Sequence, residues 1–244
     1  MRGTWKRDYL LLLTGQMVSV FGSSLHLVVV ILFLKELTGQ AYSIGIFQFV
    51  AYLPIILLSP VGGVAADGSN AKRILVAADA LRAAAMLLMG VLLWKGMLGY
   101  GLLLAGTFVV SLGTAFFQPA VHAVFPAVVD PGFLKRGNSV RGAGLLAANF
   151  AGTSLGGLLF TLAGPVVIFL FNGASFLLSA VEEAFIRFRP GPGEAGEKKP
   201  GPGEPGPEKA GTRDLRSRLR ETVAYLRRDG GALSAILTYG MIHA

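Results

Sequence analysis

The sequence predicts an all-α membrane protein that crosses the bilayer several times. Of its 244 residues, 53% are hydrophobic and only 15% are charged, whereas a soluble domain carries about 25% charged residues. The charges are also clustered, and the stretches without Asp, Glu, Lys or Arg are 9–34, 37–66, 83–94, 96–129 and 142–181. Most of them exceed the roughly 20 apolar residues that a transmembrane helix needs. Helices are expected because lipid requires internal backbone hydrogen bonds and no stretch alternates like a barrel strand.

Six complete spans are predicted, at residues 10–34, 44–66, 74–93, 100–118, 142–163 and 165–186. The long stretch 142–181 must hold two helices, because "TLAGPVV" (161–167) contains a Gly-Pro break. The N-terminus is basic and then apolar, as in a signal peptide. It lacks a small-residue cleavage site, so we interpret it as a retained first span.

The distribution of Lys and Arg predicts the orientation. With the N-terminus in the cytoplasm, 19 of the 22 basic residues lie on the cytoplasmic side. Lys35 and Lys95 then lie outside, and Arg82 lies within the third span. We expect a multi-pass protein of the plasma membrane, and this asymmetry predicts that its N-terminus lies in the cytoplasm.

The chain divides into four parts by composition. Residues 1–187 form the predicted six-helix bundle, and the Pro-, Gly- and charge-rich residues 188–212 a disordered cytoplasmic linker. Residues 213–229 carry apolar residues at helical spacing among bases, which predicts an amphipathic cytoplasmic helix. Residues 230–244 begin a seventh apolar segment that is too short to span, so we expect a chain cut off within that span.

Several segments carry a resemblance to a known family. They are "WKRDYLLLLTGQMVSVFGSSL", "FLKELTGQAYSIG", "LPIILLSPVGGVAAD", "KRILVAADALRA", "SLGTAFFQPAVHAVFPAVV" and "NGASFLLSA". Together they resemble the macrolide-efflux-like and siderophore-exporter-like branch of the major facilitator superfamily, over residues 5–187 and again over 213–244. The resemblance implies the N-terminal half of a 12-helix exporter that works by alternating access. It implies the proton gradient as the energy source, no cofactor, and three partners: a small-molecule substrate, the lipid bilayer and the missing C-terminal six-helix half.

The family's signature loop between spans two and three is Gly-x-x-x-Asp-Arg-x-Gly-Arg-Arg/Lys. Gly63, Asp67 and Lys72 match it, with Arg73 beside the last base. Three positions depart from the pattern, namely Gly68, Asn70 and Ala71. The resemblance implies that Asp67 meets the positive N-terminus of a helix from the other half, in a contact worth about 0.3–1 kcal/mol and up to ~2 when partly buried. This loop is therefore a predicted conformational switch.

A second family pattern, Gly-Pro-x-x-Gly-Gly, appears in the fifth span as "GTSLGG" (152–157). Gly152, Gly156 and Gly157 are kept, while Thr153 replaces the proline. Gly152 and Gly156 also form a Gly-x-x-x-Gly motif, which favours close packing against another helix.

Asp79 and Arg82 are charged residues inside the third span, on one helix face. Each would cost roughly 2.5–3.5 kcal/mol if alone at the bilayer centre. We consider two interpretations: a charge relay with Asp67 that senses conformation, or a compensated pair near the interface with Arg82 extending to its surface. Glu182 and Glu183, at the end of the sixth span, are expected at the interface.

His26 is the titratable group of the first span and is a candidate proton carrier. The family often has an acidic residue nearby, but Ser23 stands in that region here. The alternative is a neutral imidazole bonded to a neighbouring helix.

Other polar residues in the spans either join helices or line a substrate cavity. Gln16, Gln48 and Asn149 fit both descriptions. The resemblance implies that spans one and four face the cavity, so the candidates for the substrate and proton pathway are Gln16, His26, Phe116, Phe117, Gln118 and Asn149. A pocket of aromatic and amide groups suits a bulky amphipathic compound.

The predicted function is a secondary transporter, driven by protons, that exports drugs or other small amphipathic molecules. The alternative is a non-transporting scaffold, or a half-transporter that must dimerise. An enzyme is not expected, because the three histidines are scattered and no nucleophile, base or metal set is clustered. A metal site is not expected either, and the absence of cysteine excludes thiolate ligands. The bases lie at span ends and in one tail, which argues against nucleic acid as a partner.

Overall fold

A computed structural model describes residues 4–66 and 71–187, which lie in the first of two compact units of the chain. These residues contain helices and turns, and no strand among them. The helices are α1 (Thr4–Thr38), α2 (Tyr42–Ala66), α3 (Ala71–Trp94), α4 (Tyr100–Val128) and α5 (Leu134–Ala184). All five are long and apolar enough to cross a membrane. The predicted all-α, multi-pass fold class is therefore confirmed.

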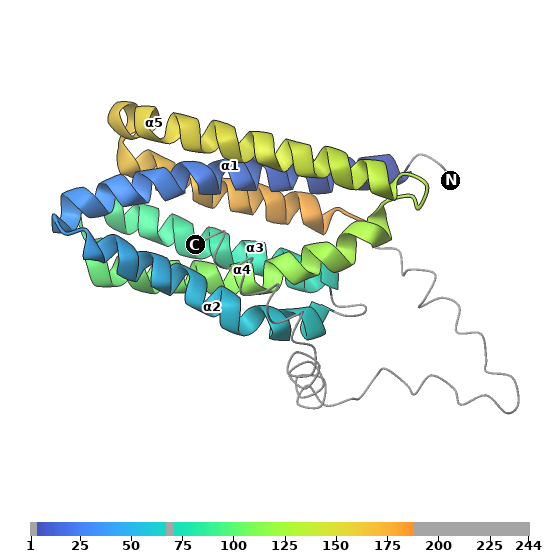
Figure 1. The fold of residues 1–244 in the computed structure, drawn as a ribbon, viewed down its shortest axis with the longest axis horizontal. Helices are drawn as coiled ribbons and strands as arrows, with labels where there is room; N and C mark the ends of the chain where they lie inside the picture. Colours follow the sequence, from blue (N-terminus) through green and yellow to red (C-terminus); the bar gives the residue numbers. More distant parts are fainter. Residues whose placement is uncertain (1–3, 67–70, 188–244) are drawn as a thin grey trace, which may run out of the picture. The chain divides into compact units, whose positions relative to one another are not determined.

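The helix α5 consists of two helical segments that meet at Gly164. The backbone of Gly164 has φ 74° and ψ 166°, a conformation that favours glycine because it has no Cβ, and Pro165 follows it. The two segments, 134–163 and 165–184, run in opposite directions beside α1 (Figure 1). The Gly-Pro break predicted at 161–167 is thus present, and the described residues cross the bundle six times.

Successive helices run antiparallel along the bundle. The start of α1, the end of α2, the end of α4 and the end of α5 lie at one end of it, and the α1–α2 and α3–α4 connections lie at the other (Figure 1). The short connections reverse the direction of the chain, but neighbours in sequence are not always the main packing partners. The helix α1 packs mainly against α5, and α2 packs mainly against α4.

Two helices extend well past the predicted spans, at the same end of the bundle. The predicted fourth span ends at 118, but α4 continues to Val128 through Pro119 and Pro126. The predicted fifth span begins at 142, but α5 begins at Leu134. Hydropathy locates the apolar part of a helix, whereas backbone hydrogen bonding continues beyond it.

Glycines bring the helices into close contact. A Cβ on Gly152 of α5 would lie 2.6 Å from the carbonyl oxygen of Phe21 in α1, and one on Gly156 would lie 2.6 Å from Cβ of Val28. On the other side of α1, Gly22 meets Ser175 in the second segment of α5. The helix α1 is therefore packed between the two segments of α5 over small residues. Gly157 has nothing within 4 Å, so the packing expected of it is absent among the described residues.

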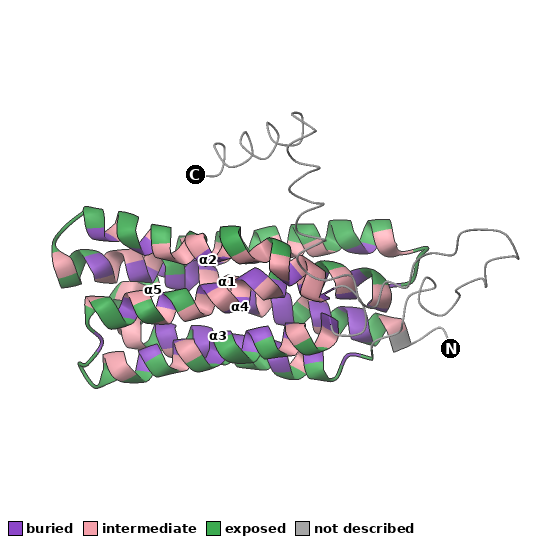
Figure 2. Ribbon diagram, turned by 90° about the horizontal axis from the view of Figure 1, so that it is seen from below, coloured by how far each residue is buried: buried purple, intermediate pink, exposed green. Residues whose placement is uncertain are grey.

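The outward faces of the helices are apolar. Figure 2 shows exposed residues along the outside of the bundle, with buried residues between the helices. Large apolar side chains are strongly exposed, among them Ile56 of α2 (70%) and Leu162 of α5 (73%). Such a surface is stable in contact with lipid tails or another apolar protein surface, and it would be unstable in water.

Several predictions fall on residues that the structure does not describe. They are Asp67 of the switch loop, the linker 188–212, the amphipathic helix 213–229 and the seventh segment 230–244. These stay predictions.

The contact between α1 and α5 gives a test with a matched control. Replacing Gly152 by Ala should lower the melting temperature of the purified protein by several degrees, because the added Cβ would meet a backbone oxygen and overpacking costs about 1–3 kcal/mol. Gly157, five residues further along α5, has open space around it, so Gly157→Ala should be neutral or stabilise by up to about 1 kcal/mol, the difference in helix propensity. Equal melting temperatures for the two variants would contradict this packing.

Candidate substrate cavity

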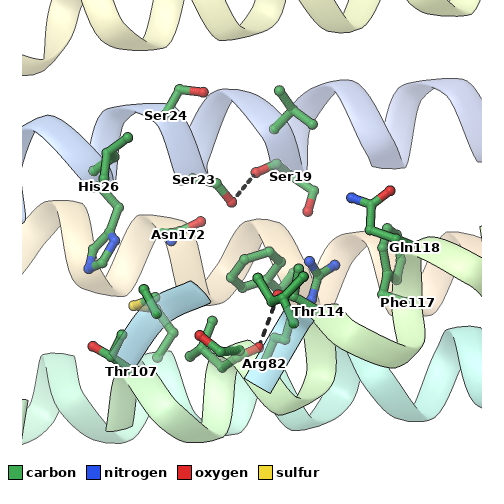
Figure 3. A pocket seen from close by; sticks show the side chains of 18 of the residues that line it. Ser19, Ser23, Ser24, His26, Arg82, Thr107, Thr114, Phe117, Gln118 and Asn172 are labelled. Carbon is green, nitrogen blue, oxygen red and sulfur yellow. Dashed lines mark hydrogen bonds between the residues drawn. The ribbon is translucent and has the colours of Figure 1, made fainter. Parts of the chain in front are cut away.

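A cavity of about 400 Å³ lies inside the bundle, and all five helices contribute side chains to it. Its wall is mixed, with apolar residues such as Phe47, Met86 and Met89 beside many hydrogen-bonding groups. The polar and charged residues that line it are Gln16, Ser19, Ser23, Ser24, His26, Gln48, Tyr52, Arg82, Thr107, Ser111, Thr114, Gln118, Arg141, Asn149 and Asn172. Figure 3 shows His26 and Thr107 toward one end of the cavity, and Phe117 and Gln118 toward the other.

Arg82 is held inside the bundle by an ion pair and two aromatic rings. Its guanidinium pairs with the carboxylate of Asp79, one helical turn earlier in α3. The carbon Cζ of Arg82 lies 4.0 Å from the ring centroid of Phe117 and 4.2 Å from that of Phe176, so rings cover the cation on two sides. Arg82 is only 5% exposed. Of the two interpretations of this pair, the compensated one fits the ion pair, but Arg82 is buried between its partners and does not extend to the surface of the bundle.

A second buried acid lies near this pair. Glu183, in the last turn of α5, is 1% exposed, and its Oε1 accepts a hydrogen bond of 3.3 Å from Ser179. The sequence did not predict this burial between helices, and the expectation that Glu183 lies at the depth of the membrane interface stays a prediction. Glu182 is partly exposed and contacts the hydroxyl of Thr14 at 3.3 Å.

Arg141 is the other charged residue in the cavity wall. Its Nε donates a hydrogen bond of 2.7 Å to Oε1 of Gln16, which joins α5 to α1. Its guanidinium also lies 5.5 Å from the ring of Phe125. The sequence interpretation missed this role, since it counted Arg141 only among the cytoplasmic bases. The available signal was its position directly before the apolar stretch that begins at residue 142.

His26 is buried beside the cavity. It is 8% exposed, and its ring meets the ring of Phe169 edge-on, with centroids 4.5 Å apart. Its Nε2 is buried and has no hydrogen-bond partner among the residues that the structure describes. A bond from this nitrogen to a neighbouring helix, as in the alternative interpretation, is therefore absent in that part of the chain.

Five of the six residues expected in the substrate pathway line the cavity, namely Gln16, His26, Phe117, Gln118 and Asn149. Phe116 does not line it, and its backbone packs against Gly62 of α2. The side chain of Asn149 donates a 2.9 Å hydrogen bond to Ser24 of α1. The amides of Gln16 and Asn149 therefore both join helices and face the cavity, so the two interpretations of these residues are compatible.

The described part of the switch loop connects two helix ends. Nζ of Lys72, at the start of α3, donates to the carbonyl oxygens of Ala184 (2.8 Å) and Ile186 (2.6 Å) at the end of α5. These carbonyls have no partner within their own helix, and a cation favours this end of the helix dipole. Arg73 is exposed, and Gly63 has nothing within 4 Å. Lys72 thus joins the start of α3 to the end of α5.

Comparisons with known proteins agree with this architecture. A family model described as Major Facilitator Superfamily matches residues 12–244. Macrolide efflux protein A of Streptococcus pyogenes is 31% identical over 125 residues, which cover 51% of this chain and 31% of that protein. Lysophospholipid transporter LplT of Yersinia pestis (strain Pestoides F) is 28% identical over 153 residues, covering 63% of this chain and 36% of the relative. The matches thus span about a third of each relative's length.

The ion pair of α3 gives a test of the buried charges. Arg82→Gln leaves Asp79 buried without its partner and should destabilise the protein by about 3–5 kcal/mol. Combining it with Asp79→Asn should recover a large part of that loss, since no uncompensated charge then remains at this pair. Thermal unfolding of the single and double variants in one detergent measures the difference. A double variant as unstable as the sum of the two single variants would contradict the pairing.

Proposed function

The chain belongs to the Major Facilitator Superfamily, a family of membrane transporters, and we propose that the protein exports small amphipathic molecules. The observation that carries the proposal is the cavity inside the bundle, with a wall that is part apolar and part hydrogen-bonding. A cavity of this kind, between helices, is where a small molecule binds in helical bundles. The names of the two relatives, one for macrolide efflux and one for lysophospholipid transport, agree with such a substrate.

We further propose that the N-terminus lies in the cytoplasm and that the protein resides in the plasma membrane. The concentration of Lys and Arg at one set of helix connections and in the tail supports the orientation. The end of the bundle that carries Lys72 and the start of α5 is then the cytoplasmic end.

Transport in this proposal proceeds by alternating access against a second six-helix half. The switch loop, with Gly63, Asp67 and Lys72, contacts that half in one state and leaves it in the other. Lys72 already binds the end of α5, so a movement of the loop is transmitted to the chain that leaves the bundle. The small-residue contact between α1 and α5 allows close packing during such movement.

We also propose that export is coupled to the movement of protons. His26 supplies a titratable nitrogen inside the bundle, buried and without a partner among the described residues. A histidine changes its charge between about pH 5 and 8. Binding a proton at His26 in one conformation and releasing it in the other would link export to the proton gradient.

The direct test is export from cells. The complete gene is expressed in a bacterial host that lacks its main efflux pumps, and retention of amphipathic dyes of different charge is followed by fluorescence. The proposal predicts faster loss of at least one dye than from cells with an empty vector. If cells with the gene retain every dye tested as long as cells with the empty vector do, the proposal is wrong.

His26 gives the test of coupling. His26→Gln should lower export driven by the pH gradient at least tenfold, with the protein still at normal abundance, because glutamine keeps hydrogen bonding but cannot carry the proton. His122 on α4 is exposed and lies outside the cavity wall, so His122→Gln should transport normally. The comparison uses everted vesicles before and after the pH gradient is collapsed. Undiminished, gradient-dependent export by His26→Gln would exclude His26 as the proton carrier.

A further inference from the structure

The charges in the cavity wall point to the kind of substrate. We propose that the cavity selects amphipathic molecules with an anionic group, a phosphate or a carboxylate, and that Arg141 and Gln16 bind this group. This inference rests on the proposed function and names its substrate class. It concerns one end of the cavity, where α1 and α5 meet.

The wall of the cavity carries only positive charge. Among the residues that line it, Arg82 and Arg141 are charged, and none is Asp or Glu. The described wall therefore offers a cationic substrate no carboxylate that could take the place of the water molecules it loses on binding. An anion would find two guanidinium groups, which are always protonated in proteins.

The two arginines differ in how far their charge is already compensated. Arg82 pairs with Asp79, while the rings of Phe117 and Phe176 cover it on two sides. The charge of Arg82 is therefore neutralised by contacts within the helix bundle. Arg141 forms no ion pair with any of the described residues. It is the uncompensated charge that faces the cavity.

The hydrogen bond between Arg141 and Gln16 fixes the orientation of both side chains. Arg141 can only donate, so the atom of Gln16 that meets its Nε must be the amide oxygen, and the amide nitrogen points elsewhere. Gln16 is 3% exposed, and its Nε2 is buried without a partner among the described residues. Nε of Arg141 is engaged, whereas the hydrogen bonds found in the described chain leave its two terminal nitrogens unused. A guanidinium fork beside an unpaired amide suits a carboxylate or phosphate.

The apolar part of the wall explains why the anion should be amphipathic. Met86 and Met89 lie four and seven residues after Arg82, about 6 and 10 Å further along α3. Both side chains belong to a buried apolar cluster with Phe47. Methionine has a flexible, unbranched side chain that adapts to the shape of a hydrocarbon tail. With its anionic head at Arg141, such a molecule would extend its apolar tail past the hydroxyls of Ser19 and Ser23 toward this cluster.

The test measures binding of matched probes to the protein from its complete gene, in nanodiscs of phosphatidylcholine. Dodecyl phosphate and dodecyltrimethylammonium share one tail and differ in the charge of the head, and inorganic phosphate is the head without a tail. Thermophoresis at probe concentrations below micelle formation, with empty nanodiscs as blank, should give at least tenfold tighter binding for dodecyl phosphate than for either other probe. Equal or tighter binding of the cation overturns the charge selectivity. Equal binding of inorganic phosphate overturns the amphipathic part.

Variants assign the site to its residues. Arg141→Gln should weaken binding of dodecyl phosphate at least tenfold, and Arg141→Lys by less. Gln16→Glu keeps the contact between α1 and α5 but neutralises Arg141, so it should also lose the anion while the protein stays folded. Arg136 is exposed on the same helix and outside the cavity wall, so Arg136→Gln should bind normally. Unchanged binding by Gln16→Glu and Arg141→Gln overturns the proposal.

Transport in everted vesicles separates this inference from the proposed function. If dyes are exported while dodecyl phosphate shows no preferential binding, the protein is a transporter and the anion site is wrong. If dodecyl phosphate binds through Arg141 and no probe or dye is moved, the anion site stands and the exporter proposal falls.

Discussion

The structure depends on how the positive charge of Arg82 is stabilised inside an apolar bundle. An arginine at the centre of a membrane helix is costly unless it finds partners within the protein. Asp79 supplies the opposite charge from the same helix, and Phe117 of α4 and Phe176 of α5 cover the guanidinium from two sides. Gly113 gives the arginine stem room, because a Cβ there would lie 2.6 Å from its Cγ. One charge thus sets the positions of three helices.

The same arrangement separates a charge that stabilises the bundle from one that is available to a ligand. The compensation of Arg82 leaves Arg141 of α5 as the cation of the cavity wall that pairs with no acid in the described part of the chain. Close packing of α1 between the two segments of α5 holds Gln16 against Arg141. The packing of small residues and the chemistry of the cavity are therefore two consequences of one helix arrangement.

Much of the fold could be predicted because it follows from local chemistry. Long charge-free stretches must be helices in lipid, and Gly164 before Pro165 supplies a break that the structure shows at that residue. Helix ends could not be predicted as well. The charges near the start of α5 end the apolar stretch at 142 but do not interrupt backbone hydrogen bonding, so the helix begins at Leu134.

The site could be predicted only in part, because hydropathy does not give the rotation of a helix. Phe116 and Phe117 are neighbours in sequence, yet about 100° of rotation places only Phe117 in the cavity wall. Glu183 resembled an interfacial acid, and its burial follows from the packing of the end of α5, where Ser179 donates to its carboxyl. Arg141 resembled a loop base, and its place in the cavity depends on the contact with Gln16 in α1. Each of these requires tertiary contacts that a single sequence does not display.

The central claim is that the space between the helices is a binding cavity that water and substrate can enter. Because the chain contains no cysteine, a single Ser23→Cys variant places one thiol in the cavity wall. Leu88→Cys, on the exposed face of α3, is the control. We predict that a membrane-impermeant maleimide labels the cysteine at position 23 and not the one at 88, and that dodecyl phosphate slows the labelling. A thiol at position 23 that stays as unreactive as the control, on both sides of the membrane, would contradict the account.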